Sequence, residues 1–134
     1  MREYKFRGKD LLEKWRYGDL VQEKWKSKLN ANEKAFMIKK DKTAHTVLAE
    51  TIGQYTGLKD KNGKEIYEGD IVSFNLKSDS EGQPYIIGYI EYQTTFSGYR
   101  IMSFEGSFAL DYNIKDIEVI GNIYDNPELL EEGE

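Results

Sequence analysis

Aromatic rings beside positive charges are the residues of this chain best suited to bind a ligand. Trp15 and Tyr17 stand next to lysine and arginine, and Trp25 lies between two lysines. Rings that stack on bases and cations that hold phosphates are typical of proteins that bind single-stranded nucleic acid. An isolated tryptophan in a charged segment, such as Trp25, suits a protein interface or packs back onto its own domain. Residues 14–28 therefore support two hypotheses, a nucleic-acid site and a contact with another protein.

A second group of aromatic residues lies in the last third of the sequence and favours a protein partner, because aromatic residues are enriched at protein interfaces. The net charge of −5 and the isoelectric point of about 5.1 oppose binding to a polyanion. We therefore expect first a module that binds a protein, with nucleic acid as the alternative. The aromatic residues of this group are Tyr85, Tyr89, Tyr92, Phe96 and Tyr99, and all except Tyr85 are candidate binding residues.

The residue types that carry most enzyme chemistry are scarce. The chain has no cysteine, which excludes disulfides, thiolate nucleophiles and cysteine-bound metal centres. Its one histidine, His45, follows Lys42 and Thr43, which predict a turn, so we expect a surface histidine and not a general base. Neither G-x-x-x-x-G-K-[ST] nor G-x-G-x-x-G occurs. We expect no catalytic residue, no metal and no cofactor, and hence no enzyme.

Pairs of nearby carboxylates could in principle hold a metal ion or exchange a proton. Such sites need several carboxylates converging on one cleft, whereas these pairs lie among glycine and polar residues typical of turns. The stretch Asp60-Lys61-Asn62-Gly63 resembles part of a calcium loop, but its glycine comes two residues early for an EF-hand. We therefore expect a turn or a surface role for each of them. The pairs are Glu68 with Asp70, Asp79 with Glu81, and Asp111 with Asp116.

Charge is distributed unevenly along the chain. Residues 1–45 contain 13 lysines and arginines against 7 acidic residues, whereas residues 46–134 contain 6 against 17. Such a division indicates a nucleic-acid-binding arm, an attraction between the two parts, or ordinary solvated surfaces. Because opposite charges and exposed strand edges also favour pairing between copies, we expect a homo-oligomer, either a dimer or a larger closed ring.

Alternation of apolar and polar residues predicts that the first third of the chain consists of strands. Gly18 interrupts one aromatic-rich strand and indicates a bulge or a bend there. Residues 23–34 are almost entirely polar and form either a loop or a frayed helix. The expected strands, paired as two hairpins, cover residues 4–7, 15–22, 35–39 and 46–49.

The rest of the chain predicts a small barrel of short strands followed by one helical turn. Residues 53–69 are punctuated by glycines, and Asn62-Gly63 is a strong turn signal. Asn126 and Pro127 are expected to cap and begin the helical turn at 126–130. The expected strands cover residues 71–74, 85–92, 99–104, 107–110 and 117–124. The expected core comprises Ile71, Phe74, Ile87, Ile90, Ile101, Val119 and Ile123.

Two longer motifs and two shorter ones resemble those of the YopX-like proteins of phages and prophages. The resemblance implies a β-rich fold whose C-terminal part is similar to SH3-type small barrels, with no established activity. The expected protein is therefore all-β, with an N-terminal β-rich basic segment at 1–52 and an SH3-like barrel at 53–134. The motifs are residues 53–72 and 118–130, together with residues 5–8 and 15–20.

The function expected on these grounds is that of a non-enzymatic phage or prophage accessory protein. Its partner would be a host or phage protein, with nucleic acid at residues 14–28 as the alternative. The longest apolar stretch, residues 85–90, is far shorter than the roughly 20 residues that span a bilayer. We expect no membrane association and a location in the cytoplasm of the bacterial host.

Overall fold

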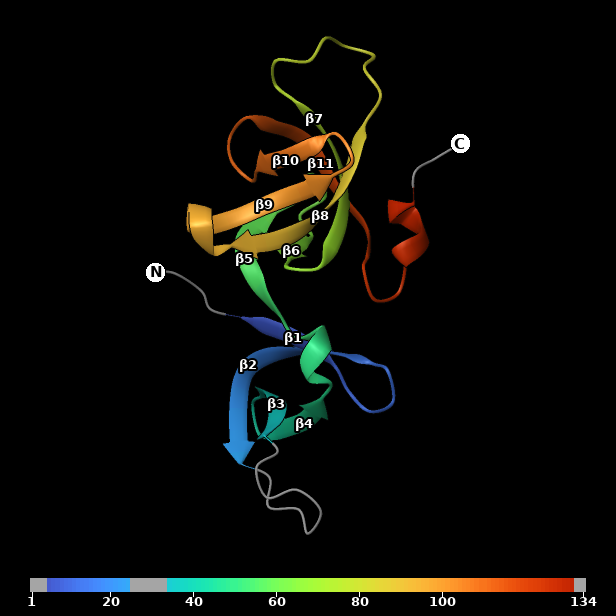
Figure 1. The fold of residues 1–134 in the computed structure, drawn as a ribbon. Helices are drawn as coiled ribbons and strands as arrows, with labels where there is room; N and C mark the ends of the chain where they lie inside the picture. The colour runs from blue at the N-terminus through green and yellow to red at the C-terminus, as the bar shows by residue number, and fades with distance from the viewer. Residues whose placement is uncertain (1–4, 25–33, 132–134) are drawn as a thin grey trace. The chain divides into compact units, whose positions relative to one another are not determined.

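The computed structural model describes residues 5–24 and 34–131, and it consists of β-strands with three short 3₁₀ segments (Figure 1). The predicted all-β class is confirmed. The chain divides into two compact units, residues 1–55 and 56–134, called unit 1 and unit 2 below. The predicted division into domains at 1–52 and 53–134 stays a prediction. Within the described residues, none of the helical segments has the length and apolar character needed to cross a membrane.

Unit 1 is an antiparallel sheet with the strand order β4-β3-β2-β1-β5. Its two hairpins are the predicted ones, because β1 pairs with β2 and β3 pairs with β4. A 3₁₀ segment, η1, connects β4 to β5, and the start of β5 pairs with β1. The elements are β1 (Phe6–Lys9), β2 (Trp15–Lys24), β3 (Lys34–Lys40), β4 (Thr43–Val47), η1 (Ala49–Thr51) and β5 (Gly53–Lys59).

The bend predicted at Gly18 is the point at which β2 changes partners. Strand β2 pairs with β1 up to Gly18 and with β3 from Asp19 onward. Gly18 has a φ of 154°, and a Cβ atom at this position would collide with the backbone oxygen of Lys39. Only glycine therefore allows β2 to cross so close to β3. The buried side chains of Ile38 and Val47 form the centre of this sheet.

Unit 2 contains a five-stranded antiparallel sheet with the order β10-β9-β8-β7-β11. Strand β6 lies beside β5, which continues from unit 1 into unit 2. A 3₁₀ segment, η3, follows β11 and packs against β8. The elements are β6 (Glu65–Tyr67), β7 (Asp70–Leu76), β8 (Ile86–Gln93), η2 (Thr94–Phe96), β9 (Gly98–Ser103), β10 (Gly106–Ala109), β11 (Ile114–Asn122) and η3 (Pro127–Leu130).

One apolar cluster forms the core of unit 2. Phe108 on β10 packs edge-on against Phe74, with 5.5 Å between ring centroids, and Val119 on β11 also packs against the cluster. Because β10 and β11 are the two edge strands, side chains from both edges reach one core and the sheet must curl. The strand pairing itself is an open order, so the SH3-like barrel stays a prediction. The buried members are Ile66, Val72, Phe74, Ile86, Ile90 and Ile101.

The expectation that Ile87 belongs to the core is wrong. Ile87 is 41% exposed, whereas Ile86 and Ile90 on the same strand are buried. The run around these residues is apolar at consecutive positions, so alternation along the sequence does not show which set faces inward. The prediction is confirmed for the buried Ile71, Phe74, Ile90 and Ile101, while Val119 and Ile123 are half-buried.

Two further details of the prediction need correction. Residues 53–69 contain strands β5 and β6, because the glycines mark single turn or bulge positions between short extended segments. Asn126 does not cap η3 through its side chain. Its Oδ1 instead accepts a hydrogen bond from the backbone N–H of Asn122. The expected helical turn is present as a 3₁₀ segment, held in place by this side-chain bond to the end of β11.

Candidate functional site

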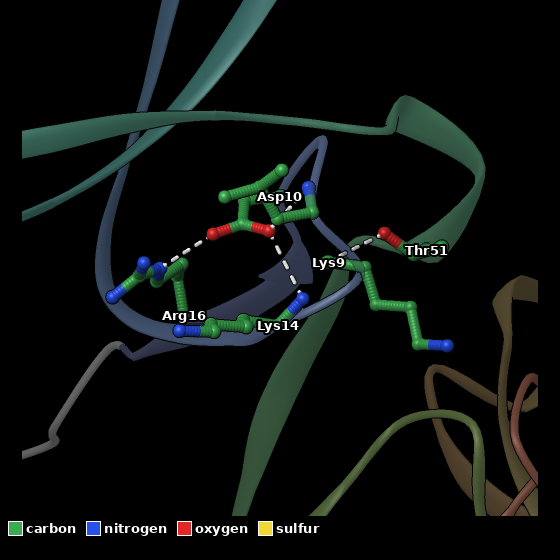
Figure 2. A network of polar contacts seen from close by, with 6 residues as sticks. Lys9, Asp10, Lys14, Arg16 and Thr51 are labelled. Carbon is green, nitrogen blue, oxygen red and sulfur yellow. Dashed lines mark hydrogen bonds and ion pairs between the residues drawn. The ribbon is translucent and has the colours of Figure 1, made fainter.

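Asp10 organises the turn between β1 and β2 (Figure 2). One carboxylate oxygen accepts hydrogen bonds from the backbone N–H groups of Leu12 and Lys14, at 2.8 and 2.9 Å. The other oxygen accepts a bond from Nε of Arg16 at 2.8 Å. The backbone hydrogen bond from Lys14 is the main cause that lowers the pKa of Asp10 to about 2, and the bond from Arg16 adds to it. The carboxylate is therefore charged at neutral pH and fixes the Arg16 side chain.

Arg16 lines a cavity of about 440 Å³ in unit 1. It is open to solvent and lies between β2, which bends at Gly18, and the hairpin of β3 and β4. Its lining includes two aromatic residues, an apolar side chain, two cations and one carboxylate. The lining residues are Trp15, Arg16, Tyr17, Ile38, Lys40, Asp41, Thr43 and His45.

Trp15 and Tyr17, predicted as binding residues, both line this cavity. Trp15 is half-buried, and the guanidinium carbon of Arg7 lies 4.6 Å from the centroid of its ring. Nζ of Lys9 lies 5.7 Å from the same centroid. These cation–π contacts hold the Trp15 ring against the side chains of Arg7 and Lys9. Tyr17 is 42% exposed.

His45 is not in a turn, contrary to the expectation. It lies in β4 opposite Ile38, is half-buried and lines the cavity. The turn indicated by Lys42 and Thr43 is shorter than expected, because β4 already begins at Thr43. Trp25, the third predicted aromatic residue of this part of the chain, lies outside the described residues.

Unit 2 carries a smaller groove of about 270 Å³ on the outer face of β8 and β9. Tyr89 and Met102 lie directly opposite each other in the strand ladder, so their side chains share this face. Leu130 of η3 forms one wall, and Phe104, which follows the end of β9 and is 73% exposed, forms another. The full lining is Ile87, Tyr89, Met102, Ser103, Phe104 and Leu130.

The hydroxyl of Tyr89 is kept neutral in this groove. Burial is the main cause that raises the pKa of Tyr89, and the negative charge of Glu91 raises it further. Glu91 lies two residues along β8 and therefore on the same outer face. The groove accordingly has apolar walls with a carboxylate near one end.

The other predicted residues of unit 2 gather where β8 turns into β9. Tyr92 and Tyr99 are opposite each other and their rings meet edge to face, with centroids 5.2 Å apart. Phe96 is 63% exposed, and the guanidinium carbon of Arg100 lies 4.5 Å from its ring centroid. The structure thus brings Tyr92 and Tyr99 together on one face of the hairpin and places Tyr89 on the opposite face.

Acidic side chains serve as hydrogen-bond acceptors in turns. Asp70 accepts a bond from the N–H of Tyr67, Asp79 from that of Leu76, and Asp111 from that of Asn113. In the described part of the chain, no three histidine, aspartate or glutamate side chains gather as a metal site requires.

The sequence analysis did not single out several lining residues. Ile38 and Lys40 lie about 20 residues along the chain from Tyr17, whereas Met102 and Phe104 follow Tyr99 within five residues and meet Tyr89 only through the pairing of β8 with β9. A signal for the groove was nevertheless present. The uninterrupted apolar run at 85–90 supplies more apolar side chains than one face of a strand needs, so some must lie on the second face.

Comparison with known protein families tests the resemblance to YopX-like proteins that the sequence motifs indicated. The family model described as YopX protein matches residues 5–131. The chain belongs to the YopX family. The chain is similar to protein EF1440 from Enterococcus faecalis, whose crystal structure is known. The two sequences are 24% identical, the TM-score is 0.49, and the match covers 98% of this chain and 100% of that one. No curated protein matches the sequence.

Proposed function

We propose that this YopX family member is a non-enzymatic phage or prophage accessory protein that binds a protein partner through the groove of unit 2. The observation that carries the proposal is the second apolar face of β8 and β9. Ile87 and Phe104 are exposed there, whereas Ile86 and Ile90 on the other face of β8 belong to the buried core. Apolar side chains that gather around a depression on the surface mark a contact site more than they serve the fold.

The size of the groove favours a side chain of a partner over a free small molecule. Small-molecule sites commonly have volumes of about 300–1,000 Å³. The groove, at about 270 Å³, lies below that range and is open along the strand face. Its volume suits one or two apolar side chains presented by a polypeptide, which is how buried anchors occupy protein interfaces.

The negative charge of unit 2 indicates which kind of polypeptide would bind the groove. Residues 56–134 contain 6 lysines and arginines against 16 acidic residues. Glu91 lies beside Tyr89, Glu105 follows Phe104, and Glu128 belongs to the same 3₁₀ segment as Leu130. A segment with an apolar anchor flanked by lysine or arginine complements both the walls and the rim. The proposed partner therefore presents an apolar side chain within a basic stretch.

The absence of catalysis belongs to the proposal. The carboxylates with lowered pKa values, Asp10 and Asp60, accept backbone hydrogen bonds in turns, which holds them in structural roles. Tyr89, whose pKa is raised, lies among apolar side chains of the groove. Proton transfer in catalysis needs an acid and a base that converge on the same substrate. The proposal therefore assigns these three groups to structure and binding.

A random peptide library tests the proposal directly. The library is selected on the wild-type protein and counter-selected on Phe104→Ser, which removes one exposed wall of the groove. We expect enrichment of peptides with a leucine or aromatic residue next to lysine or arginine. A selection that Phe104→Ser does not deplete, or that enriches acidic peptides, would contradict the proposal.

Methionine methyl signals then locate the bound peptide. Met102 lines the groove, whereas Met37 lies in β3 of unit 1 and serves as an internal control. The enriched peptide should shift the NMR signal of Met102 and leave that of Met37 in place. Ile87→Ser should weaken binding about tenfold, because a buried anchor contact is lost. The matched variant Leu58→Ser, at an exposed apolar residue outside the groove, should bind normally.

A further inference from the structure

The cavity of unit 1 contains polar side chains that share one face of the sheet. Lys40 pairs with Thr43 across the hairpin of β3 and β4, and Ile38 pairs with His45. Residues that pair across a ladder, and residues two apart along a strand, point to the same face. The side chains of Lys40, Thr43 and His45 therefore surround the buried Ile38 on a single face.

Arg16 of β2 meets the cavity from the same face. It pairs with Gly8 of β1, and a Cβ atom at Gly8 would lie 3.1 Å from the side chain of Val47. Val47 is two residues along β4 from His45, so its side chain points to the face that carries His45. Arg16 and His45 accordingly line the same cavity from different strands.

The rings of Trp15 and Tyr17 lie on the opposite face of β2. Trp15 pairs with Lys9 and Tyr17 pairs with Arg7, and both of these cations contact the Trp15 ring. The polar side chains of the cavity therefore select its ligand, and stacking on these two rings plays no part.

Most of these polar side chains are hydrogen-bond donors that have no partner. Asp10 holds Arg16 through Nε at 2.8 Å, which leaves both Nη groups of the guanidinium for a ligand (Figure 2). Among the described residues, the side chains of Lys40, Thr43 and His45 form no hydrogen bond or ion pair. Arginine and lysine only donate, and threonine and histidine can donate. A negatively charged group that accepts several hydrogen bonds at once satisfies such donors best.

Asp10 orders the Arg16 side chain and stays behind it. Its carboxylate is only 7% exposed, and its oxygens already accept bonds from the N–H groups of Leu12 and Lys14 and from Nε of Arg16. Because the guanidinium is held in place before a ligand arrives, binding costs little conformational entropy at this residue.

Asp41 limits the negative charge that the cavity accepts, because it is the one carboxylate among the described lining residues. It lies in the turn between β3 and β4. The described residues 5–22 and 36–55 contain 8 lysines and arginines against 5 acidic residues. The local balance favours an anion, and Asp41 is the position at which a substitution should raise the affinity for it.

We propose that this cavity binds a phosphate group. Arg16 donates to it from β2, Lys40 from β3 and His45 from β4. A tetrahedral anion suits donors that converge from three strands, whereas Arg16 alone satisfies a planar carboxylate. The cavity of about 440 Å³ is open to solvent and larger than one phosphate, so the group can belong to a small phosphorylated molecule or to a nucleic-acid strand. The site lies in unit 1 and does not depend on the proposed protein-binding groove.

The ring of His45 reports on binding, because it is the only histidine of the chain. Proton NMR spectra of the untagged, full-length protein are recorded at constant pH and ionic strength while inorganic phosphate replaces chloride. We expect the two ring C–H signals of His45 to shift and to saturate. Acetate should bind at least about fivefold more weakly, because it offers the donors fewer oxygens. Unchanged His45 signals, or equal affinity for acetate, would overturn the proposal.

Two neighbouring lysines distinguish the site from a general effect of charge. Lys40 and Lys39 are both exposed, but Lys39 pairs with Ala44 and points to the other face of β3. Lys40→Gln should weaken phosphate binding about fivefold, whereas Lys39→Gln, with the same change of charge, should weaken it less than about twofold. Thermal unfolding checks that both variants are folded. Equal weakening by the two variants would contradict the assignment of the cavity.

Asp41→Asn should have the opposite effect. Removal of the carboxylate should strengthen phosphate binding about threefold, because an exposed like charge no longer repels the anion. Asparagine tolerates the φ of 56° at this position, so the turn is preserved. A damaged site would bind more weakly and not more tightly. Unchanged or weaker binding by a folded Asp41→Asn variant would show that the phosphate does not lie in this cavity.

Glycerol phosphate and a short single-stranded thymidine oligonucleotide distinguish the two sources of the phosphate. For a nucleic-acid strand, the oligonucleotide should bind more tightly than glycerol phosphate, and its affinity should fall steeply as salt is added. For a small phosphorylated molecule, the oligonucleotide should bind no more tightly. Either pattern supports the site if Lys40→Gln weakens it and Lys39→Gln does not. Binding of both ligands that the two variants weaken equally would refute it.

Discussion

Two turns, one in each unit, have the same construction and different roles. In each, an aspartate accepts hydrogen bonds from the backbone N–H groups two and four residues later, and its own N–H donates to the carbonyl four residues later. These turns are Asp10–Lys14 between β1 and β2 and Asp60–Lys64 between β5 and β6. Two local sequences that share an aspartate at the first position therefore form the same pattern of hydrogen bonds.

The second carboxylate oxygen makes the difference. In Asp10 it accepts a bond from the side chain of Arg16, only six residues away, and so it positions a residue of the cavity. In Asp60 it accepts a bond from the backbone N–H of Val119 at 3.0 Å, 59 residues away. One turn therefore organises a candidate binding site, whereas the other attaches a loop to an edge strand of a sheet.

The largest effect is expected from Asp60→Ala. This change leaves the N–H groups of Asn62, Lys64 and Val119 without their acceptor, and it should lower the free energy of unfolding by about 3 kcal/mol. Hydrogen exchange at the Val119 amide should accelerate. Asp10→Ala is the matched change and should leave exchange at Val119 unaltered. Equal loss of protection at Val119 in both variants would remove the distinction between the turns.

Low pH should destabilise both turns, because it protonates the carboxylates of Asp10 and Asp60. Hydrogen bonds to Lys14 and Arg16 lower the pKa of Asp10 to about 2 from 3.8. Burial acts to raise the pKa of Asp60, but bonds from Val119, Lys64 and Asn62 outweigh it and lower the value. Because the folded pKa values lie below the unfolded ones, this stability is present above about pH 4 and is lost as the pH falls toward 2.

Unfolding measured between pH 5 and 2 checks this dependence. Asp10→Asn and Asp60→Asn should each flatten the decline of the unfolding free energy with falling pH. The double variant should be flatter than either single one, since the two groups lie in separate units. A decline as steep in the double variant as in the wild type would show that other groups are responsible.

The fourth position of each turn offers a smaller test. Gly63 has a φ of 83° and Glu13, the equivalent residue, has a φ of 63°. Gly63→Ala should cost about 1 kcal/mol through backbone strain alone, because a Cβ atom there meets no neighbour within 4 Å. Glu13→Gly should change the unfolding free energy by less than about 1 kcal/mol, and in the stabilising direction. A large loss in Glu13→Gly would mean that its side chain matters more than its backbone.

Charge provides the smallest expected effect. Unit 1 contains 13 lysines and arginines against 8 acidic residues, in contrast to the acidic unit 2. The prediction that copies associate through these opposite charges calls for light scattering in low and moderate salt. We expect a dimer or a closed ring in low salt that weakens as salt screens the charges. A monomer in both conditions would end this idea.

The sequence predicted local structure well where neighbouring residues decide it. Asp60-Lys61-Asn62-Gly63 was expected to turn and does, because the aspartate and the glycine act within five residues. The turn at Asp10–Lys14 has glutamate where the other has glycine, so its sequence indicates a turn less strongly. Strands β5 and β6 were missed because their glycines indicated turns throughout.

The candidate sites depended on distant residues. Trp15 and Tyr17 were expected as binding residues because they stand beside cations, and both are at the lining of one cavity. The contributions of Lys40 and His45 depend on the pairing of β3 with β2 and β4. No pattern within a single strand specifies that pairing.

The sequence by itself determined the all-β class, the places of most strands and the membership of the YopX family. These follow from alternation, turn residues and motifs, which act over a few residues. Only the tertiary structure decided which face of β8 is covered, and hence that Ile87 lies in a groove and not in the core. The reason is that a strand apolar on both faces buries whichever face the rest of the chain packs against.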